Sequence, residues 1–337
     1  MTSSTDAEQT MQLALERFRV RMATANRKFI QDRVDEIEAR GLASEEEKWR
    51  KMAEYRHIEP NEKETKFPQR LVDLPAAVDK VFPFPIDGVH PPRLRTDDAR
   101  EQFLDMLQQV FQQQAEEWAA ERGRETPGLL PRCDELNVFL KYAYAVEDPD
   151  FRLSAIPPFE PGLTLLSVEQ AELAETQPEQ YREQVREECA QVREFLESDG
   201  TGDLINKAIV GPWVEADDLE VKAGVITGTG YIGEYPHWYS TYLYCRQRED
   251  AVRDYAIPDA PNIRNWAWRV VVLDDKGDFL APSVIYGRKP RFDSIPEFLD
   301  WYCSWPDYLD ARRIRSLRRH AVQCETDCES DCDMHIA

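Results

Sequence analysis

The sequence has little of what membrane-spanning and secreted proteins need. Its longest purely aliphatic run covers only residues 270–273, so no segment is long enough to cross a bilayer. Residues 1–12 are polar and acidic, and they lack the apolar stretch of a secretory signal. The 337 residues include only 7 cysteines, an odd number, which favours reduced thiols over a disulfide framework. We therefore expect a cytoplasmic protein, with the nucleus as the alternative compartment.

Positive charge is also scarce. The chain has 42 Lys and Arg against 64 Asp and Glu, a formal net charge of −22 at pH 7. Nucleic acids and anionic membranes bind proteins through local positive potential, so we expect no nucleic acid and no membrane as a partner. Apolar residues make up 42% of the chain, which is enough to build a core. The length is typical of about two domains.

Several common catalytic and cofactor motifs are missing. The sequence has no Ser nucleophile elbow, no Walker loop and no H-E-x-x-H zinc motif. Residues 228–233 match the dinucleotide pattern G-x-G-x-x-G, but that pattern needs a following helix whose N-terminus holds the pyrophosphate. The residues that follow it here indicate a turn and a strand. We therefore interpret the glycines as a bulged loop between strands, and we expect no cofactor and no catalytic residue.

Residues 1–57 predict a helical hairpin or a short coiled-coil arm. Residues 5–40 carry apolar side chains at alternating spacings of four and three, the seam of a coiled coil. Gly41 is placed to end this helix, and Ser44 with Glu47 forms a capping box for a second helix. The pattern fits packing on the same chain, which we favour, or a homodimer seam. The oligomeric state therefore stays open.

Residues 58–96 predict a proline-rich strap. The segment carries seven prolines, which lack an amide hydrogen and restrict the preceding residue. We therefore expect an extended stretch that lies on the core rather than regular structure. An amphipathic helix is predicted over residues 97–122, a short helix around residues 136–144 and a further helix over residues 178–198.

From residue 221 onward the sequence predicts an antiparallel sheet. Four segments are rich in Val, Tyr and Trp, with Gly, Pro and Asp between them: 221–227, 238–245, 266–273 and 279–286. Ser294 then caps a last helix that carries Pro296 in its first turn. Because helices come first and strands later, the predicted fold is α+β. An N-terminal helical segment precedes helices packed on a mostly antiparallel sheet, closed by a C-terminal helix.

Three stretches carry a resemblance to a known family. They are Leu130-Pro131 with Phe139-Leu140, the strand 268–273 before Asp275-Lys276-Gly277-Asp278, and Ser294-Ile295-Pro296-Glu297-Phe298-Leu299. Together they resemble the SMI1/KNR4-like (SUKH) superfamily, in particular its fungal proteins. The resemblance implies that residues 97–310 form an α+β SMI1/KNR4-like domain. It also implies a non-enzymatic scaffold that binds or regulates other proteins, and it carries over no catalytic residue.

The aromatic strands are the expected contact surface for a protein partner. Residues 231–244 hold six Tyr and Trp residues, which are common at binding hot spots. We predict a partly exposed, concave surface beside residues 228–233. Its five residues are Glu234, Tyr235, His237, Trp238 and Tyr239. One alternative is an enzyme whose pocket lies near residues 228–239, with Glu234, His237 and Tyr239 as acid–base candidates. Another is that both faces of these strands are covered.

Two charged segments remain. Residues 160–220 hold 16 acids and 4 bases, which indicates a solvated face or a docking surface for a basic partner. Residues 311–337 form an Arg-rich segment followed by an acidic tail. The tail contains four residues of metal-ligand type: Cys324, Cys328, Cys332 and His335. Acids separate them and no apolar residues surround them, so we favour a solvated tail and expect no metal there. Whether these four ever bind a metal stays open.

Overall fold

The computed structural model combines helices with two small antiparallel sheets, so the chain belongs to the mixed helix-and-sheet class. No helix among the residues that it describes has the length and apolar character needed to cross a membrane. The described residues are 4–53, 67–82, 85–94, 96–121, 123, 128–148, 158–161, 177, 179–180, 183, 221–232, 237–247, 266–274, 291–292 and 294–304.

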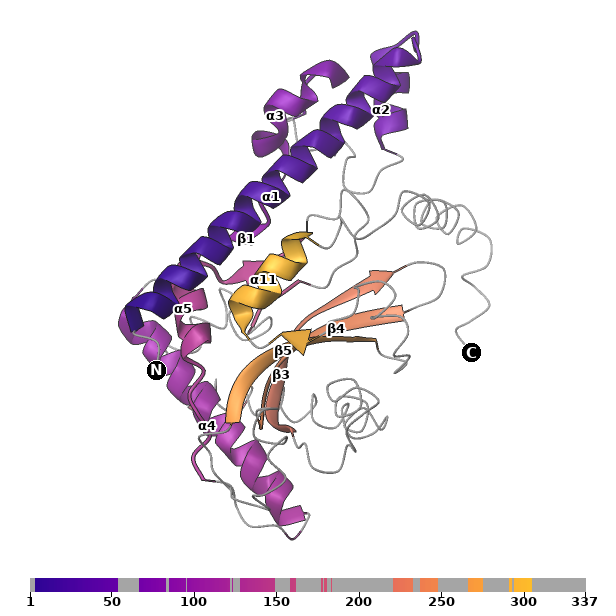
Figure 1. The fold of residues 1–337 in the computed structure, drawn as a ribbon. Coiled ribbons are helices and arrows are strands. Elements are labelled where there is room, and N and C mark those ends of the chain that lie inside the picture. Colours follow the sequence, from indigo (N-terminus) through magenta and orange to yellow (C-terminus); the bar gives the residue numbers. More distant parts are fainter. Residues whose placement is uncertain are drawn as a thin grey trace, which may run out of the picture.

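Helix α1 (Ser4–Ala39) runs along one side of the described structure and contacts α2, α3, α5 and α11 (Figure 1). The predicted seam residues Met11, Leu15, Phe18 and Met22 are each at most 1% exposed, and they are covered by side chains of the same chain. The helix ends where Gly41 adopts a φ of 63°, a conformation that glycine reaches without strain. The seam is therefore occupied within the chain and is not available to a second copy in this conformation.

Helix α2 (Glu45–Met52), η1 (Leu71–Asp73) and α3 (Leu74–Val81) pack around one end of α1 (Figure 1). The expected extended strap was wrong for residues 71–81, which are helical. Pro75 stands in the first turn of α3, where its missing amide hydrogen costs nothing. Leu74, Val78 and Val81 then recur at helical spacing and are buried against α1. The position of the proline, not the number of prolines, decides the structure here.

Helix α4 (Asp97–Glu121) and helix α5 (Asp134–Tyr142) lie at the other end of α1 (Figure 1). Two glutamines on α4 bind the backbone of Leu130. The amide of Gln108 donates to the Leu130 carbonyl at 2.8 Å, and the amide oxygen of Gln112 accepts from the Leu130 N–H at 2.9 Å. The strands β1 (Val89–His90) and β2 (Ala145–Val146) form a two-stranded ribbon, and β1 contacts α1.

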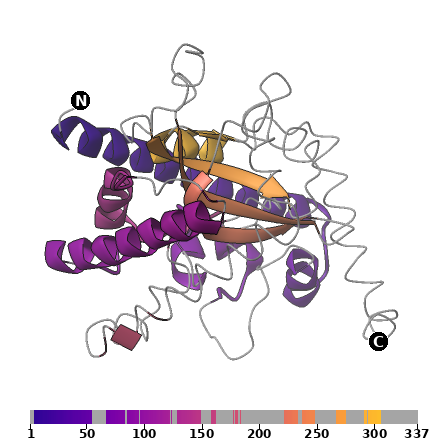
Figure 2. The ribbon, with the colours of Figure 1, turned by 90° about the horizontal axis from the view of Figure 1, so that it is seen from below.

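The larger sheet has the order β3-β4-β5-β6, and every pair is antiparallel. Its strands are β3 (Val221–Ile232), β4 (His237–Gln247), β5 (Trp266–Asp274) and β6 (Arg291–Phe292). The expected glycine loop over residues 228–233 was wrong up to Ile232, because β3 continues to that residue. The expected bulge is present, since the register shifts between Ile226 and Gly228. Figure 2 shows α4 on one side of this sheet and α11 on the other.

Helix α11 (Ile295–Ser304) packs against α1. Ser294 Oγ accepts from the Glu297 N–H at 3.2 Å and so caps its first turn, as the sequence indicated. The guanidinium of Arg17 on α1 makes two hydrogen bonds, of 2.8 and 2.7 Å, to the carboxylate of Asp300. Beneath this pair the rings of Phe18 and Tyr302 meet edge to face, 5.3 Å apart.

The two hydrophobic clusters share α1. One cluster joins the N-terminal half of α1 to α4, α5, the larger sheet and α11, and the other joins its C-terminal half to α2, η1 and α3. The predicted segment 1–57 therefore does not pack by itself, because its longest helix shares one core with residues 71–86 and the other with residues beyond 88. Several expectations fall outside the described residues: most of helix 178–198, strand 279–286, the turn at residues 275–277 and the tail 311–337.

Candidate functional site

The structure describes only part of the predicted aromatic surface. Glu234 and Tyr235 lie outside the described residues. His237, Trp238 and Tyr239 are the first residues of β4, and their backbones pair with residues 230–232 of β3. The structure does not describe the positions of their side chains. The predicted binding surface therefore stays a prediction.

Further along β4, the described side chains are buried on both faces. Tyr242 and Tyr244 are 3% and 1% exposed on one face, while Leu243 and Cys245 are fully buried on the other. In this part of the strand the aromatic side chains are buried, so an exposed aromatic surface on β4 would lie nearer the start of the strand.

A polar cluster at the β1–β2 ribbon is the most chemically rich group among the described side chains. Its members, here called the His90 cluster, are His90, Arg93, Tyr144, Glu147 and Glu160. The ribbon brings them together from three separate segments. Backbone hydrogen bonds join the Tyr144 N–H to the His90 carbonyl at 3.2 Å and the Glu147 N–H to the Gly88 carbonyl at 2.8 Å.

The imidazole of His90 is engaged at both nitrogens. Nε2 lies 2.6 Å from Glu147 Oε1, and Nδ1 lies 3.2 Å from the hydroxyl of Tyr144. An ionised carboxylate only accepts hydrogen bonds, so Nε2 carries the hydrogen in this pair. In the neutral ring Nδ1 is then the acceptor, and the Tyr144 hydroxyl donates to it. Glu147, His90 and Tyr144 thus form one directed chain of hydrogen bonds.

Arg93 completes the cluster from the other side. Its guanidinium carbon lies 3.7 Å from the centre of the Tyr144 ring, a close cation–π contact. The same guanidinium lies 3.7 Å from Glu160 Oε1. Burial raises the pKa of Tyr144, and the charge of Arg93 partly opposes this rise. Burial also raises the pKa of Glu160, again opposed by Arg93.

Two glycines allow the backbone to approach closely around this cluster. Gly88 has a φ of 68°, and a Cβ at this position would lie 2.1 Å from the carbonyl oxygen of Glu147. Gly228 lies against Pro158, whose carbonyl oxygen would be 1.8 Å from an added Cβ. Next to it, the Glu160 N–H donates to the Thr227 carbonyl at 2.6 Å. The predicted glycine motif therefore serves a close contact between β3 and the segment that carries Glu160.

Sequence reasoning did not find the His90 cluster. His90 is followed by two prolines in the segment read as a strap, and its partners Tyr144 and Glu147 stand 54 and 57 positions away. No local spacing links residues so far apart. The only signal in the sequence was the pair of glycines that permit the close approach.

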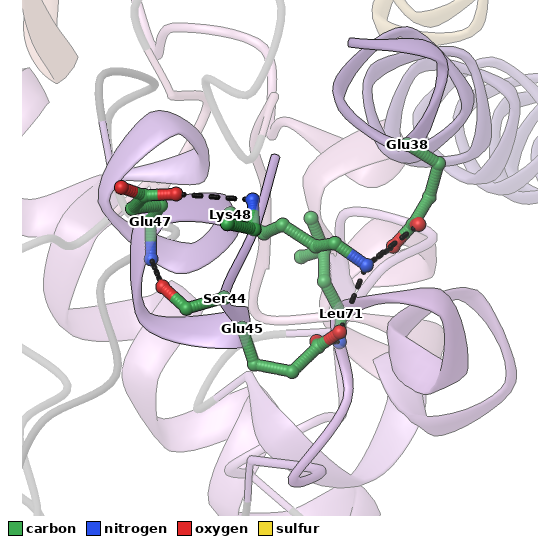
Figure 3. A network of polar contacts seen from close by, with 7 residues as sticks. Glu38, Ser44, Glu45, Glu47, Lys48 and Leu71 are labelled. Atoms are coloured by element: carbon green, nitrogen blue, oxygen red, sulfur yellow. Dashed lines mark hydrogen bonds and ion pairs between the residues drawn. The ribbon is translucent and has the colours of Figure 1, made fainter. Parts of the chain in front are cut away.

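A second network joins α2 to α1 and η1 (Figure 3). Lys48 Nζ donates to Glu38 and to Glu45, each at 2.8 Å, and the other oxygen of Glu45 accepts from the Leu71 N–H at 2.8 Å. The two carboxylates raise the pKa of Lys48, so its amine stays protonated and is no nucleophile. We interpret this network as a structural clamp.

The described thiols are also unsuited to chemistry. Cys133, Cys245 and Cys303 are buried, and burial raises the pKa of Cys245 to about 12. A thiol that stays protonated is a poor nucleophile and a poor metal ligand. Among the residues that the structure describes, no group of three or more His, Cys, Asp or Glu side chains could hold a metal ion.

Comparison of the chain with models of protein families, with curated proteins and with solved structures gives no match. The His90 cluster offers a guanidinium, a phenol, an imidazole and two carboxylates in fixed positions and partial contact with solvent. Such a group can recognise a polar partner, and its directed hydrogen bonds can move a proton.

Proposed function

We propose that this protein is a non-enzymatic scaffold that binds or regulates another protein, of the SMI1/KNR4-like kind that its sequence resembles. In this proposal, residues 97–310 form the SMI1/KNR4-like domain and α11 is its closing helix. The three stretches that carry the resemblance support it, since each begins or forms a regular element. Leu130-Pro131 leads into α5, residues 268–273 lie in β5, and Ser294 starts α11.

The single observation that carries the proposal is the stack of Arg93 on Tyr144. Tyr and Arg are the residue types most enriched at binding hot spots, because they combine area with directional polar contacts. The Arg93 side chain is 32% exposed, so it is both positioned by the ring and open to solvent. The backbone bonds of the β1–β2 ribbon hold the stack before any partner arrives, which reduces the entropy lost on binding.

The enzyme alternative near residues 228–239 is less well supported. Its proposed acid–base residues lie outside the described side chains, and the nearest described cluster has both imidazole nitrogens engaged. Both nitrogens of His90 bind side chains of this chain, so neither is directed at a separate substrate, as the general base of an enzyme must be.

The experiment is affinity capture with the full chain, followed by a binding measurement with the purified partner. Arg93→Ala is compared with Arg132→Ala, a matched control whose side chain is 35% exposed and paired with Glu101. We expect Arg93→Ala to weaken binding by about 2 kcal/mol, roughly thirtyfold, and Arg132→Ala to leave it unchanged. Trp238→Ala tests the predicted aromatic surface in the same assay.

Equal effects of the two arginine variants would contradict the proposed surface. If only Trp238→Ala abolishes binding of the partner, the binding surface lies on β4 instead. Thermal unfolding of each variant separates loss of contact from loss of fold. A full chain that captures no specific protein would contradict the scaffold function itself.

A further inference from the structure

We propose that Tyr144 is a modification site for activated acyl donors, made reactive by the hydrogen-bonded chain Glu147–His90–Tyr144. This goes beyond protein binding, because it assigns a covalent chemistry to one side chain. The relevant donors are thioesters, acyl phosphates and other acyl groups on good leaving groups, all of which react with oxygen nucleophiles.

The geometry supplies the base that a phenol needs. The Tyr144 hydroxyl donates to His90 Nδ1 over 3.2 Å, so a proton leaving the oxygen has an acceptor already in place. Glu147 holds the opposite nitrogen at 2.6 Å, which fixes the tautomer and stabilises the imidazolium that forms. This is the order of roles in nucleophile–base–carboxylate triads, with a phenol in place of the usual hydroxyl or thiol.

Arg93 favours the same step electrostatically. Its positive charge lies 3.7 Å from the ring centre, so it stabilises the negative charge that develops on the phenol as the proton leaves. Burial raises the pKa of Tyr144, and the phenol is therefore protonated at rest. A protonated phenol is a weak nucleophile, which is why the neighbouring imidazole is needed.

The reaction balances as an acyl transfer. The Tyr144 oxygen forms a bond to the acyl carbon, the bond from that carbon to the leaving group breaks, and the phenolic proton passes to His90 Nδ1. His90 then gives this proton to the leaving group, so the imidazole returns to its neutral form. The product is a phenyl ester on Tyr144. An ester has no hydroxyl proton to donate to His90, so acylation would break the Tyr144–His90 hydrogen bond and place an acyl group beside Arg93. That consequence for docking rests on the proposed function, whereas the reactivity does not.

The test uses N-acetylimidazole on the purified full chain, with no partner present. Rates of acetylation are followed by peptide mass spectrometry, with fragment ions that separate the two nearby tyrosines. Tyr142 is the internal control, because its hydroxyl donates to the Glu8 carboxylate rather than to an imidazole. Hydroxylamine removes acetyl from a phenol but not from Lys141, which identifies the ester. We expect Tyr144 to react at least about tenfold faster than Tyr142, as a general base provides.

Two variants show whether the imidazole is the cause. His90→Gln keeps a polar side chain but removes the base, and we expect the Tyr144 rate to fall to that of Tyr142. Glu147→Gln keeps the shape and removes the charge, and we expect an intermediate rate. Thermal unfolding and the Tyr142 rate report whether each variant is folded. The proposal is overturned if Tyr144 reacts no faster than Tyr142, or if its rate survives His90→Gln in a folded protein. Either result leaves the docking experiment unaffected, because that experiment measures partner binding alone.

Discussion

Replacing Gly88 by alanine is the sharpest test of how the β1–β2 ribbon is built. Gly88 stands directly before β1 with a φ of 68°, and its carbonyl accepts from the Glu147 N–H at 2.8 Å. An alanine Cβ would lie 2.1 Å from the Glu147 carbonyl oxygen and 3.2 Å from Cε1 of Phe18. The first of these contacts is far inside van der Waals distance, and its partner is backbone, so the ribbon must separate.

The expected cost has three parts. The left-handed backbone costs an alanine roughly 1–2 kcal/mol. Loss or stretching of one buried backbone hydrogen bond adds roughly 0.5–1.5 kcal/mol. Crowding against Glu147 and Phe18 adds roughly 1–3 kcal/mol, as overpacked sites do. We therefore expect Gly88→Ala to lower the free energy of unfolding by about 3 kcal/mol or more.

Gly41→Ala is the matched control. Gly41 has nearly the same φ, 63°, but a Cβ there has nothing within 4 Å. Gly41→Ala should therefore lower the free energy of unfolding only by the backbone contribution of roughly 1–2 kcal/mol. Denaturant unfolding of both variants gives the difference directly. If Gly88→Ala costs no more than Gly41→Ala, the Gly88 backbone does not lie against Glu147, and the geometry assigned to the His90 cluster is wrong.

Three further outcomes are expected. Ser44→Ala removes the acceptor for the Glu47 N–H and should cost about 1 kcal/mol in unfolding free energy, whereas a loss below the error of the measurement would contradict the cap. Burial raises the pKa of Glu135, so the folded state binds that proton more tightly than the unfolded state and stability falls as the pH rises from the ordinary Glu range to the raised value. The free energy of unfolding of Glu135→Gln should therefore rise relative to that of the parent protein as the pH increases through this range. A difference between the two proteins that stays constant from pH 4 to pH 7 would contradict this expectation. Iodoacetamide should leave Cys133 and Cys245 unmodified in the native protein and modify both in denaturant, as mass spectrometry would show, because burial raises the pKa of both thiols.

Local signals predicted local structure well. The spacing of apolar residues and Gly41 placed α1 to within a residue or two, and Ser294 placed the start of α11. These signals work because caps and helical faces depend on residues three or four positions apart. The same logic failed for α3, where the proline count outweighed the helical spacing of Leu74, Val78 and Val81. A proline in the first turn is compatible with a helix, because the amide hydrogen that it lacks has no partner within the helix at that position.

Long-range contacts were not predictable in this way. His90, Tyr144 and Glu160 meet because β1, β2 and the bridge between Val146 and Phe159 lie side by side. Nothing in the spacing of these residues along the sequence encodes that arrangement. The burial of Tyr242 and Tyr244 on β4 was not predictable either, since the sequence left open whether both faces of these strands are covered. Alternation indicates two faces, but it does not reveal whether a second layer covers the outer one.

The close contact at Gly228 connects the predicted surface to the observed cluster. Thr227 binds the backbone of Glu160, and residues 230–232, a few positions along the same strand, pair with His237, Trp238 and Tyr239. A strand rises about 3.3 Å per residue, so the two groups lie roughly 10–17 Å apart along β3. A typical interface buries about 800 Å² on each partner, which is wide enough to span that distance. One partner could therefore contact both groups, and then Arg93→Ala and Trp238→Ala should each weaken binding of the same protein. If each variant loses a different partner, the two surfaces are independent and the docking site must be divided between them.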